Sequence, residues 1–554
     1  MAVAPTPVAA APDAPDRAQR ATFSARATAF FDWIKNTFVA GVNALASNVY
    51  ANAQDAASSA ANAVAQSASA TAQAGIATAQ AAAATSAAAT ATTQAGVATT
   101  QAASITTAAA TSTAKADVAT AKAAEATAAA ATATAIVLGV STGYPIIRPS
   151  LTLDFANSQI FDPRITFTRA SSGTRTNERG LIESLASGVP RIDFDPVTGE
   201  CRGLLIEEAR TNLLLRSAEF DNASWTKTRA TITANATTAP DGTLTGDKIV
   251  SDATAANTHD IRQQVTVSDT TFAFSIYFKA AECTWALIEV QNAAAQVSRA
   301  RAWFNLATGV VGAGNTADAG VTYVSHSITN AGGGWYRCSL TCTTALTGLQ
   351  IFIEPTTGDN ITDWNGNSTD GAFVWGAQLE VGAFPTSYIL SGGAATTRAA
   401  DVAVMTGVDF ASWYRQDEGT FVVNGKCSQP VPAAQYPRLF QVGTSSANTM
   451  AVLFDGGRLY ALSVFGGAEV FNAGATRTAT VDNRVSMAYK RNDYALSING
   501  GVAAADTTGD VPTVTRLAVG LSVGAWGFFN GTISDLTYYP LRLTNAELQA
   551  LSAQ

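Results

Sequence analysis

Two neighbouring carboxylates, Glu207 and Glu208, stand in an apolar stretch, and a carboxylate pair is the minimum machinery of a glycosidase. Such an enzyme needs its two groups about 5–9 Å apart, on either side of one bond. Consecutive side chains of a strand point to opposite faces, so this pair cannot flank one bond. Arg210 follows Glu208 by two residues and shares its face, which favours an ion pair. The pattern indicates a structural role, and we predict no catalytic residues and no enzyme.

A second chemical candidate is the oxygen-rich segment GDNITDWNGNSTD at 358–370. Its Asp-x-Asn-x-Asn spacing imitates the opening of a calcium loop, but glycine is missing after Asn367 and Val374 stands where the final glutamate belongs. The segment could still hold a structural Ca²⁺, and an ordinary solvated turn is the alternative. The ligands predicted for a calcium ion are Asp359, Asp363, Asn365 and Asp370.

Sugar binding is the third candidate chemistry, because a sugar site combines an aromatic plate with hydrogen-bonding amides or carboxylates. Trp364 lies inside the polar loop, where burial in the core would be awkward, so we predict that it binds glycan together with Asn365 and Asn367. A second predicted contact is Trp526 with Asn530, in the glycine-rich run GAWGFFNG at 524–531. Three other tryptophans lie in strand patterns and are expected in the core: Trp285, Trp303 and Trp335.

Charge and composition limit the classes of partner that the chain is expected to bind. The 554 residues include 34 basic and 42 acidic ones, a net charge of −8, so nucleic acid and anionic membranes are not expected partners. The longest strongly apolar run is far too short to span a bilayer. The N-terminal MAVAPTPVAAAPDAPDR has no basic region before an apolar core, so no secretory signal is expected. Five scattered cysteines are expected to be buried free thiols.

The elements that would carry these residues begin with an amphipathic helix. Bulky residues recur every three, four or seven positions from about residue 23, which predicts a helix with one apolar stripe. We assign residues 1–50 to an anchoring segment, with a short helix packed on its own chain as the alternative. The predicted anchoring residues are Phe23, Phe30, Ile34 and Phe38.

Residues 51–138 are dominated by alanine, threonine, serine and glutamine, and they contain a repeat of 21 residues. The repeat appears as QAGIATAQ at 73–80, QAGVATTQ at 94–101 and KADVATAK at 115–122. Three heptads per repeat place Ile76, Val97 and Val118 on one seam, which predicts a left-handed coiled coil between chains. A disordered alanine–threonine linker is the alternative, because threonine, serine and glycine weaken a helix.

From residue 139 onward the signals are those of β-structure. Residues 139–212 are expected to form a connector of short strands, 213–397 a jelly-roll sandwich and 398–554 a second sandwich. In the first sandwich, Phe272, Phe274, Ile276 and Phe278 alternate with smaller residues, so one face of that strand should be buried. Near the end of the chain, Thr544 and Glu547 have the spacing of a capping box for a short last helix.

The chain resembles fibre and spike proteins of tailed bacteriophages and phage-like particles, including head spikes of gene transfer agents. The resemblance spans nearly the whole chain. Its most specific part is DPRITFTRASSGTR at 162–175 with GLLIEEARTNLL at 203–214, which looks like the neck of such fibres. ATFSARATAFFDW at 21–33 is similar to their particle-anchoring end. The segments SAEFDNASW at 217–225 and GAQLEVGAFPTSYI at 376–389 resemble carbohydrate-binding jelly-roll modules, and 398–554 resembles laminin-G and concanavalin-A-type lectins.

This resemblance implies a mainly β, homotrimeric fibre with an N-terminal coiled-coil stalk. It would be a virion appendage assembled in the host cytoplasm, holding other virion proteins through its N-terminus and binding host surface polysaccharide. Three chains with two modules each would turn weak glycan contacts into avidity without catalysis. Two alternatives stay open: a polysaccharide depolymerase fibre, and a purely structural decoration or adaptor of the virion.

Overall fold

The computed structural model describes residues 145–553 except 295–296, 318–319 and 433. In the N-terminal part it also describes Thr28, Ala29, Asp32, Asn36, Thr120, Lys122 and Ala123. The chain divides into two compact units, Met1–Thr134 and Ala135–Gln554. The predicted anchoring residues Phe23, Phe30, Ile34 and Phe38 and the seam of the 21-residue repeat lie outside the described residues. The stalk and its pairing between chains therefore stay predictions. No helix within the described residues is long and apolar enough to cross a membrane.

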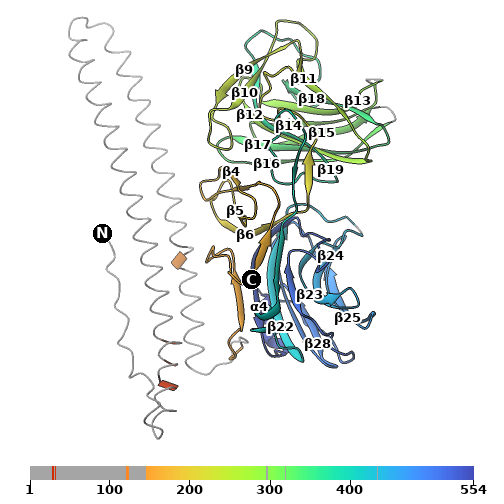
Figure 1. The fold of residues 1–554 in the computed structure, drawn as a ribbon. Coiled ribbons are helices and arrows are strands. Elements are labelled where there is room, and N and C mark those ends of the chain that lie inside the picture. Colours follow the sequence, from red (N-terminus) through yellow and green to blue (C-terminus); the bar gives the residue numbers. More distant parts are fainter. Residues whose placement is uncertain are drawn as a thin grey trace, which may run out of the picture. The chain divides into compact units, whose positions relative to one another are not determined.

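The second unit is mainly β, as the sequence predicts, and its first sandwich lies between residues 226 and 381 (Figure 1). One antiparallel sheet has the order β16-β17-β12-β19-β10-β9 and the other β15-β14-β13-β18-β11-β8. The first sheet consists of β9 (Ala230–Thr237), β10 (Gly246–Ser251), β12 (Thr271–Ala280), β16 (Val321–Asn330), β17 (Trp335–Thr344) and β19 (Gly371–Val381). The second consists of β8 (Thr226–Thr228), β11 (Asp260–Thr266), β13 (Trp285–Asn292), β14 (Arg299–Asn305), β15 (Val310–Ala317) and β18 (Gly348–Thr356).

The core of the first sandwich follows from strand alternation. Phe272, Phe274, Ile276 and Phe278 of β12 are fully buried between the sheets, which confirms the prediction for that face. The opposite face of β12 is buried as well, because Tyr277 packs there in a smaller aromatic cluster. That cluster consists of Tyr277, Trp335, Trp375 and Tyr388 with Ala239, and Ile182 of the expected connector packs against it. Strand alternation alone does not predict this second buried face.

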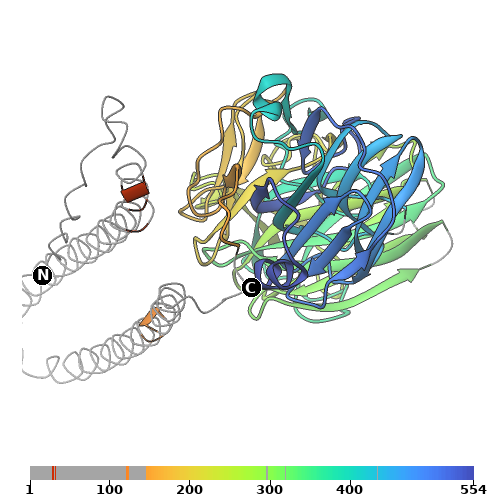
Figure 2. The ribbon, with the colours of Figure 1, turned by 90° about the horizontal axis from the view of Figure 1, so that it is seen from below.

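The second sandwich is formed by the end of the chain together with strands from residues 151–206 (Figures 1 and 2). Its first sheet has the order β29-β28-β27-β22-β31-β6-β5, with β1 also paired to β31, and its second has the order β2-β21-β30-β23-β24-β25-β26. The early strands are β1 (Leu151–Asp154), β2 (Thr166–Thr168), β5 (Ile192–Phe194) and β6 (Cys201–Ile206). The later ones are β21 (Val402–Thr406), β22 (Glu418–Cys427), β23 (Arg438–Ser445), β24 (Asn448–Asp455), β25 (Arg458–Phe465), β26 (Ala468–Thr476), β27 (Asn483–Lys490), β28 (Tyr494–Ile498), β29 (Ala504–Asp506), β30 (Arg516–Val519) and β31 (Gly531–Tyr539).

The boundaries expected at 139–212 and 398–554 therefore do not match the sheets. Strand β31 is long enough for β6 to pair with residues 531–533 and β1 with residues 535–538, end to end on one edge. Leu151, Leu153 and Phe155 enter the core of the second sandwich. The physical reason is that these short apolar strands cannot bury their side chains alone and complete the C-terminal sheet instead.

Within the described residues of this unit, four short strands and two helices remain. Strands β3 (Gly173–Thr176) and β4 (Ile182–Leu185) pair with each other, as do β7 (Arg210–Asn212) and β20 (Thr396–Arg398). The helices are α4 (Gly407–Ala411) and α5 (Asn545–Ser552). The predicted capping box begins α5, since Thr544 accepts a hydrogen bond from the Glu547 backbone and Glu547 accepts one in return.

Candidate functional site

The predicted glycan plate Trp364 is buried, with only 6% of its surface exposed. Its indole Nε1 donates to the Pro355 carbonyl at 3.1 Å, and its ring meets the His259 ring edge-on at 4.7 Å between centroids. Its backbone forms an isolated antiparallel bridge with Asn257. The prediction that Trp364 presents a sugar-binding face is therefore wrong, because the indole is buried against His259 and bonded to the Pro355 carbonyl.

The amides beside Trp364 stabilise turns. Asn365 Oδ1 accepts a hydrogen bond from the Ala256 backbone at 2.8 Å. Asn367 Oδ1 accepts from the backbone of Thr369 at 2.9 Å and of Asp370 at 2.8 Å. These oxygens hold turns of the loop, and the predicted glycan contact of Asn365 and Asn367 stays untested.

The carboxylates predicted to hold calcium do not form a cluster. Asp359 Oδ1 accepts from the Ala313 backbone at 2.7 Å, at strand β15, while Asp370 Oδ1 accepts from Thr369 Oγ1 at 3.2 Å. Over the described part of the chain, no three His, Cys, Asp or Glu side chains are grouped as a metal site requires. Calcium at Asp359, Asp363, Asn365 and Asp370 stays an untested prediction.

Of the two tryptophans predicted to bind glycan, Trp526 is exposed, with 51% of its surface accessible. The Arg438 guanidinium carbon lies 4.0 Å from the centre of its ring. The turn that carries it is closed by Ser522, whose backbone donates to the Trp526 carbonyl at 2.8 Å and whose hydroxyl accepts from the Trp526 backbone at 3.0 Å. One face of the indole is therefore fixed against a cation and the remainder faces solvent.

Arg438 itself is 6% exposed and has no carboxylate partner among the described residues. Its Nη1 donates to the Tyr436 carbonyl at 2.7 Å, and its Nε has no hydrogen-bond partner. Burial lowers the pKa of Arg438 to about 10, so it remains charged at neutral pH. A Cβ at Gly527, where φ is +59°, would come 2.2 Å from Nη1, so glycine at this position permits the close approach. Sequence reasoning missed Arg438.

Asn530, the predicted partner of Trp526, is already hydrogen-bonded to other parts of the fold. Its Oδ1 accepts from the Glu208 backbone at 3.0 Å, and its Nδ2 donates to the Phe528 carbonyl at 3.3 Å. It therefore joins the second sandwich to the strand end after β6. The structure does not bring Asn530 to a sugar-binding position beside Trp526.

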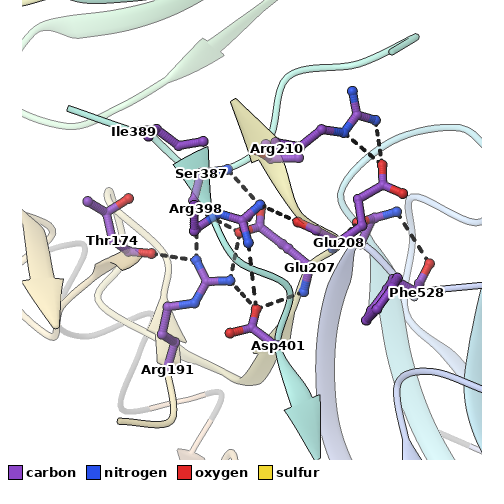
Figure 3. A network of polar contacts seen from close by, with 12 residues as sticks. Thr174, Arg191, Glu207, Glu208, Arg210, Ser387, Ile389, Arg398, Asp401 and Phe528 are labelled. Atoms are coloured by element: carbon purple, nitrogen blue, oxygen red, sulfur yellow. Dashed lines mark hydrogen bonds and ion pairs between the residues drawn. The ribbon is translucent and has the colours of Figure 1, made fainter. Parts of the chain in front are cut away.

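Glu207 and Glu208 point apart, as predicted (Figure 3). Glu208 Oε1 accepts from Arg210 Nε at 2.8 Å, which confirms the expected ion pair. Glu207 faces a buried cluster in which Arg191 Nη2 lies 2.8 Å and Arg398 Nη2 3.5 Å from its Oε2. The Ser387 backbone and hydroxyl donate to Glu207 at 2.7 and 2.6 Å.

The other carboxylate of this cluster, Asp401, contacts all three arginines. Arg169 Nη1 lies 3.0 Å from Asp401 Oδ1, Arg191 forms a close hydrogen bond to Oδ2, and Arg398 Nη1 lies 3.9 Å away. These four side chains are at most 1% exposed. Three arginines that converge could bind an anionic ligand, but here the chain's own carboxylates occupy them. We call this cluster of Arg169, Arg191, Glu207, Arg398 and Asp401 the clamp.

A cleft of about 320 Å³ lies beside the clamp. Its walls come from β12, β16 and β17 of the first sandwich, from residues 174–207 and 385–388, and from residues 426–429, 480 and 532 of the second sandwich. The hairpin between β16 and β17 closes on the Pro196 carbonyl, where a Cβ at Gly332 would approach to 2.6 Å. The cleft thus depends on contacts between segments far apart in the sequence.

Comparison with known proteins gives no family and no curated relative that matches the chain. Solved structures match at low similarity. A CBM40 of a Ruminococcus gnavus sialidase bound to α2,6-sialyllactose is 17% identical, covering 25% of this chain and 85% of that one, with a TM-score of 0.22. Mouse laminin α1 domains LG4-5 are 11% identical over 51% of this chain and 88% of that one, with a TM-score of 0.19. The structural neighbours are thus carbohydrate-binding and lectin-like β-sandwich domains.

Trypanosoma rangeli sialidase with sialic acid is also similar, at 11% identity over 55% of this chain and 58% of that one, with a TM-score of 0.22. A variant of that sialidase with trans-sialidase activity matches as well. These enzymes overturn the prediction that the chain is not an enzyme, and we do not maintain it. These similarities assign neither a reaction nor a catalytic residue to this chain.

Proposed function

We propose that this chain binds saccharide through Trp526, as part of a virion appendage that attaches to a host surface polysaccharide. The observation that carries the proposal is the indole of Trp526, half exposed on the second sandwich and backed by Arg438 at 4.0 Å. An aromatic ring presents an apolar face to the apolar face of a sugar, and a ring held in place loses little entropy on binding.

The appendage itself rests on the resemblance of the sequence to phage fibres. In this proposal residues 1–50 attach to other virion proteins and the repeat at 51–138 winds three chains together, so that weak contacts are multiplied. The mass of the full chain in solution, compared with that of a variant lacking residues 1–135, tests the arrangement. Three copies for the full chain and one for the deletion support trimerisation through the stalk. A monomeric full chain would refute it.

The sugar-binding site is tested by titrating host polysaccharide into the full chain and into Trp526→Ala. We expect the substitution to weaken binding by about tenfold or more, the scale of one aromatic contact. Phe465→Ala is the matched control, since Phe465 is an exposed aromatic, 39% accessible, at the end of β25 in the same sandwich. Equal affinities of the two variants and the unsubstituted chain would refute the site. Release of oligosaccharide is measured in the same samples, which distinguishes cleavage of the polymer from binding.

A further inference from the structure

The cleft between the sandwiches contains two cationic side chains that no carboxylate of the described residues contacts directly. Four cationic side chains line it: Arg175, Arg202, Arg337 and Lys426. Two of them have partners of their own, because Arg175 Nη2 lies 2.8 Å from Glu183 and Arg202 Nη2 lies 2.7 Å from Asp195. The other two are the subject of the inference.

Neither Arg337 nor Lys426 has a carboxylate within salt-bridge distance among the described residues. Arg337 Nη2 donates to Ser275 Oγ at 3.0 Å, its Nε is buried without a hydrogen-bond partner, and its guanidinium carbon lies 5.5 Å from the centre of the Tyr277 ring. Both cations are half-buried, and a partly desolvated cation without a carboxylate partner costs free energy that an anionic ligand would recover.

The two carboxylates that line the cleft do not neutralise this pair. Glu207 is bound by Arg191 and Arg398. Asp193 accepts from the Thr176 backbone at 2.8 Å and lies 3.7 Å from Arg202. Both carboxylates therefore already have their own partners.

The remaining lining is rich in hydroxyl and amide groups, from Ser327, Thr329, Asn330, Ser428, Gln429 and Thr532. Such groups donate and accept hydrogen bonds, as a polyol requires. A volume of about 320 Å³ lies at the small end of the range for ligand pockets, which is roughly 300–1,000 Å³. We infer that this cleft binds one acidic sugar unit, its carboxylate at Arg337 and Lys426 and its hydroxyls along the polar wall. The inference does not rest on the Trp526 site.

The test uses the full chain and calorimetric titration with D-glucuronate, D-glucose and inorganic phosphate. Glucuronate is expected to bind, and glucose to bind at least about tenfold more weakly, since a hydrogen bond to a charged group accounts for that factor. Arg337→Gln and Lys426→Gln are each expected to weaken glucuronate binding by about tenfold. Arg458→Gln is the control: Arg458 lies outside the cleft, bonds to Asn472 and has no carboxylate partner among the described residues.

Three results would overturn the inference: no binding of glucuronate, unchanged affinity in both cleft variants, or phosphate binding as tightly as glucuronate, which would indicate a bare anion site. Lys426→Gln keeps the test valid if Arg337→Gln disturbs folding, because Lys426 holds β22 to β31 through its backbone and its side chain makes no hydrogen bond or ion pair with the described residues. Trp526→Ala should leave glucuronate binding unchanged. Loss of polysaccharide binding in that variant with glucuronate binding intact separates the two sites.

Discussion

Replacing Glu207 by glutamine removes a charge that the buried clamp requires. Burial raises the pKa of Glu207, but Arg398, Arg191 and the two hydrogen bonds from Ser387 outweigh it, so the pKa falls from 4.5 to about 2. A shift of that size corresponds to about 3 kcal/mol of stability at neutral pH. Removing one partner of a buried ion pair typically costs about 3–5 kcal/mol, which agrees. We therefore expect Glu207→Gln to lower the free energy of unfolding by about 3 kcal/mol.

The next residue in the chain supplies the control. Glu208 pairs with Arg210, but its side chain is 33% exposed. Because the Glu208 carboxylate is one-third exposed and is therefore screened by water, Glu208→Gln should cost clearly less than Glu207→Gln, about 1 kcal/mol. Both variants are unfolded in urea at pH 7 as full chains, with tryptophan fluorescence as the readout. The reasoning fails if the two substitutions cost the same, or if Glu207→Gln costs less than about 1 kcal/mol.

The pH dependence gives a second readout of the same carboxylate. Because the pKa of Glu207 is lowered in the folded chain, its contribution is present above pH 4.5 and is lost as the pH falls towards 2. The difference in stability between the unsubstituted chain and Glu207→Gln should therefore shrink across that window. A difference that stays constant from pH 7 to pH 3 would contradict an ionised Glu207 in the clamp.

Three further substitutions test the fold. Gly203→Ala should destabilise the second sandwich by about 1–3 kcal/mol, because φ is +103° and the new Cβ would meet the Ile533 carbonyl at 2.2 Å; an unchanged urea midpoint would contradict the pairing of β6 with β31. Burial raises the pKa of Asp260 from 3.8 to about 6, so the folded chain loses stability as the pH rises from about 4 to 6. Asp260→Asn should therefore raise the melting temperature at pH 7.5 but not at pH 3.5. A rise at pH 3.5 alone would contradict a buried, destabilising Asp260. Trp364→Ala should cost about 3–5 kcal/mol while the folded protein keeps its affinity for polysaccharide, and lost affinity in a stable variant would restore Trp364 as a sugar contact.

The features that sequence reasoning predicted correctly are local ones. The ion pair of Glu208 with Arg210 spans two residues, and the capping box of Thr544 with Glu547 spans three. The buried face of β12 follows from alternation over residues 272–278. Each of these depends on strand or helix geometry that adjacent residues determine by themselves, so the spacing alone was sufficient.

The features that it missed depend on distant partners. Trp364 was predicted to be exposed because its neighbours are polar, but its ring packs on His259 and its backbone pairs with Asn257, both more than a hundred residues earlier. Arg169 and Asp401 are 232 residues apart, and neither has a spacing that indicates the other. A fully buried arginine looks like a surface arginine in sequence, since only the fold shows what covers it. The burial of Arg438 and its contact with Trp526 could not be predicted from the sequence for the same reason.

The position of Glu207 and Glu208 explains why one short segment can order three parts of the chain. Glu207 is held by Ser387, beyond the last strand of the first sandwich, and by Asp401, next to the first C-terminal strand of the second. Glu208 is held through its backbone by Asn530. The segment that follows β6 is therefore hydrogen-bonded both to the end of the first sandwich and to the second sandwich, and we call Glu207 and Glu208 the joint. Since the acidic-sugar cleft takes its walls from these same segments, the joint determines the geometry of that cleft.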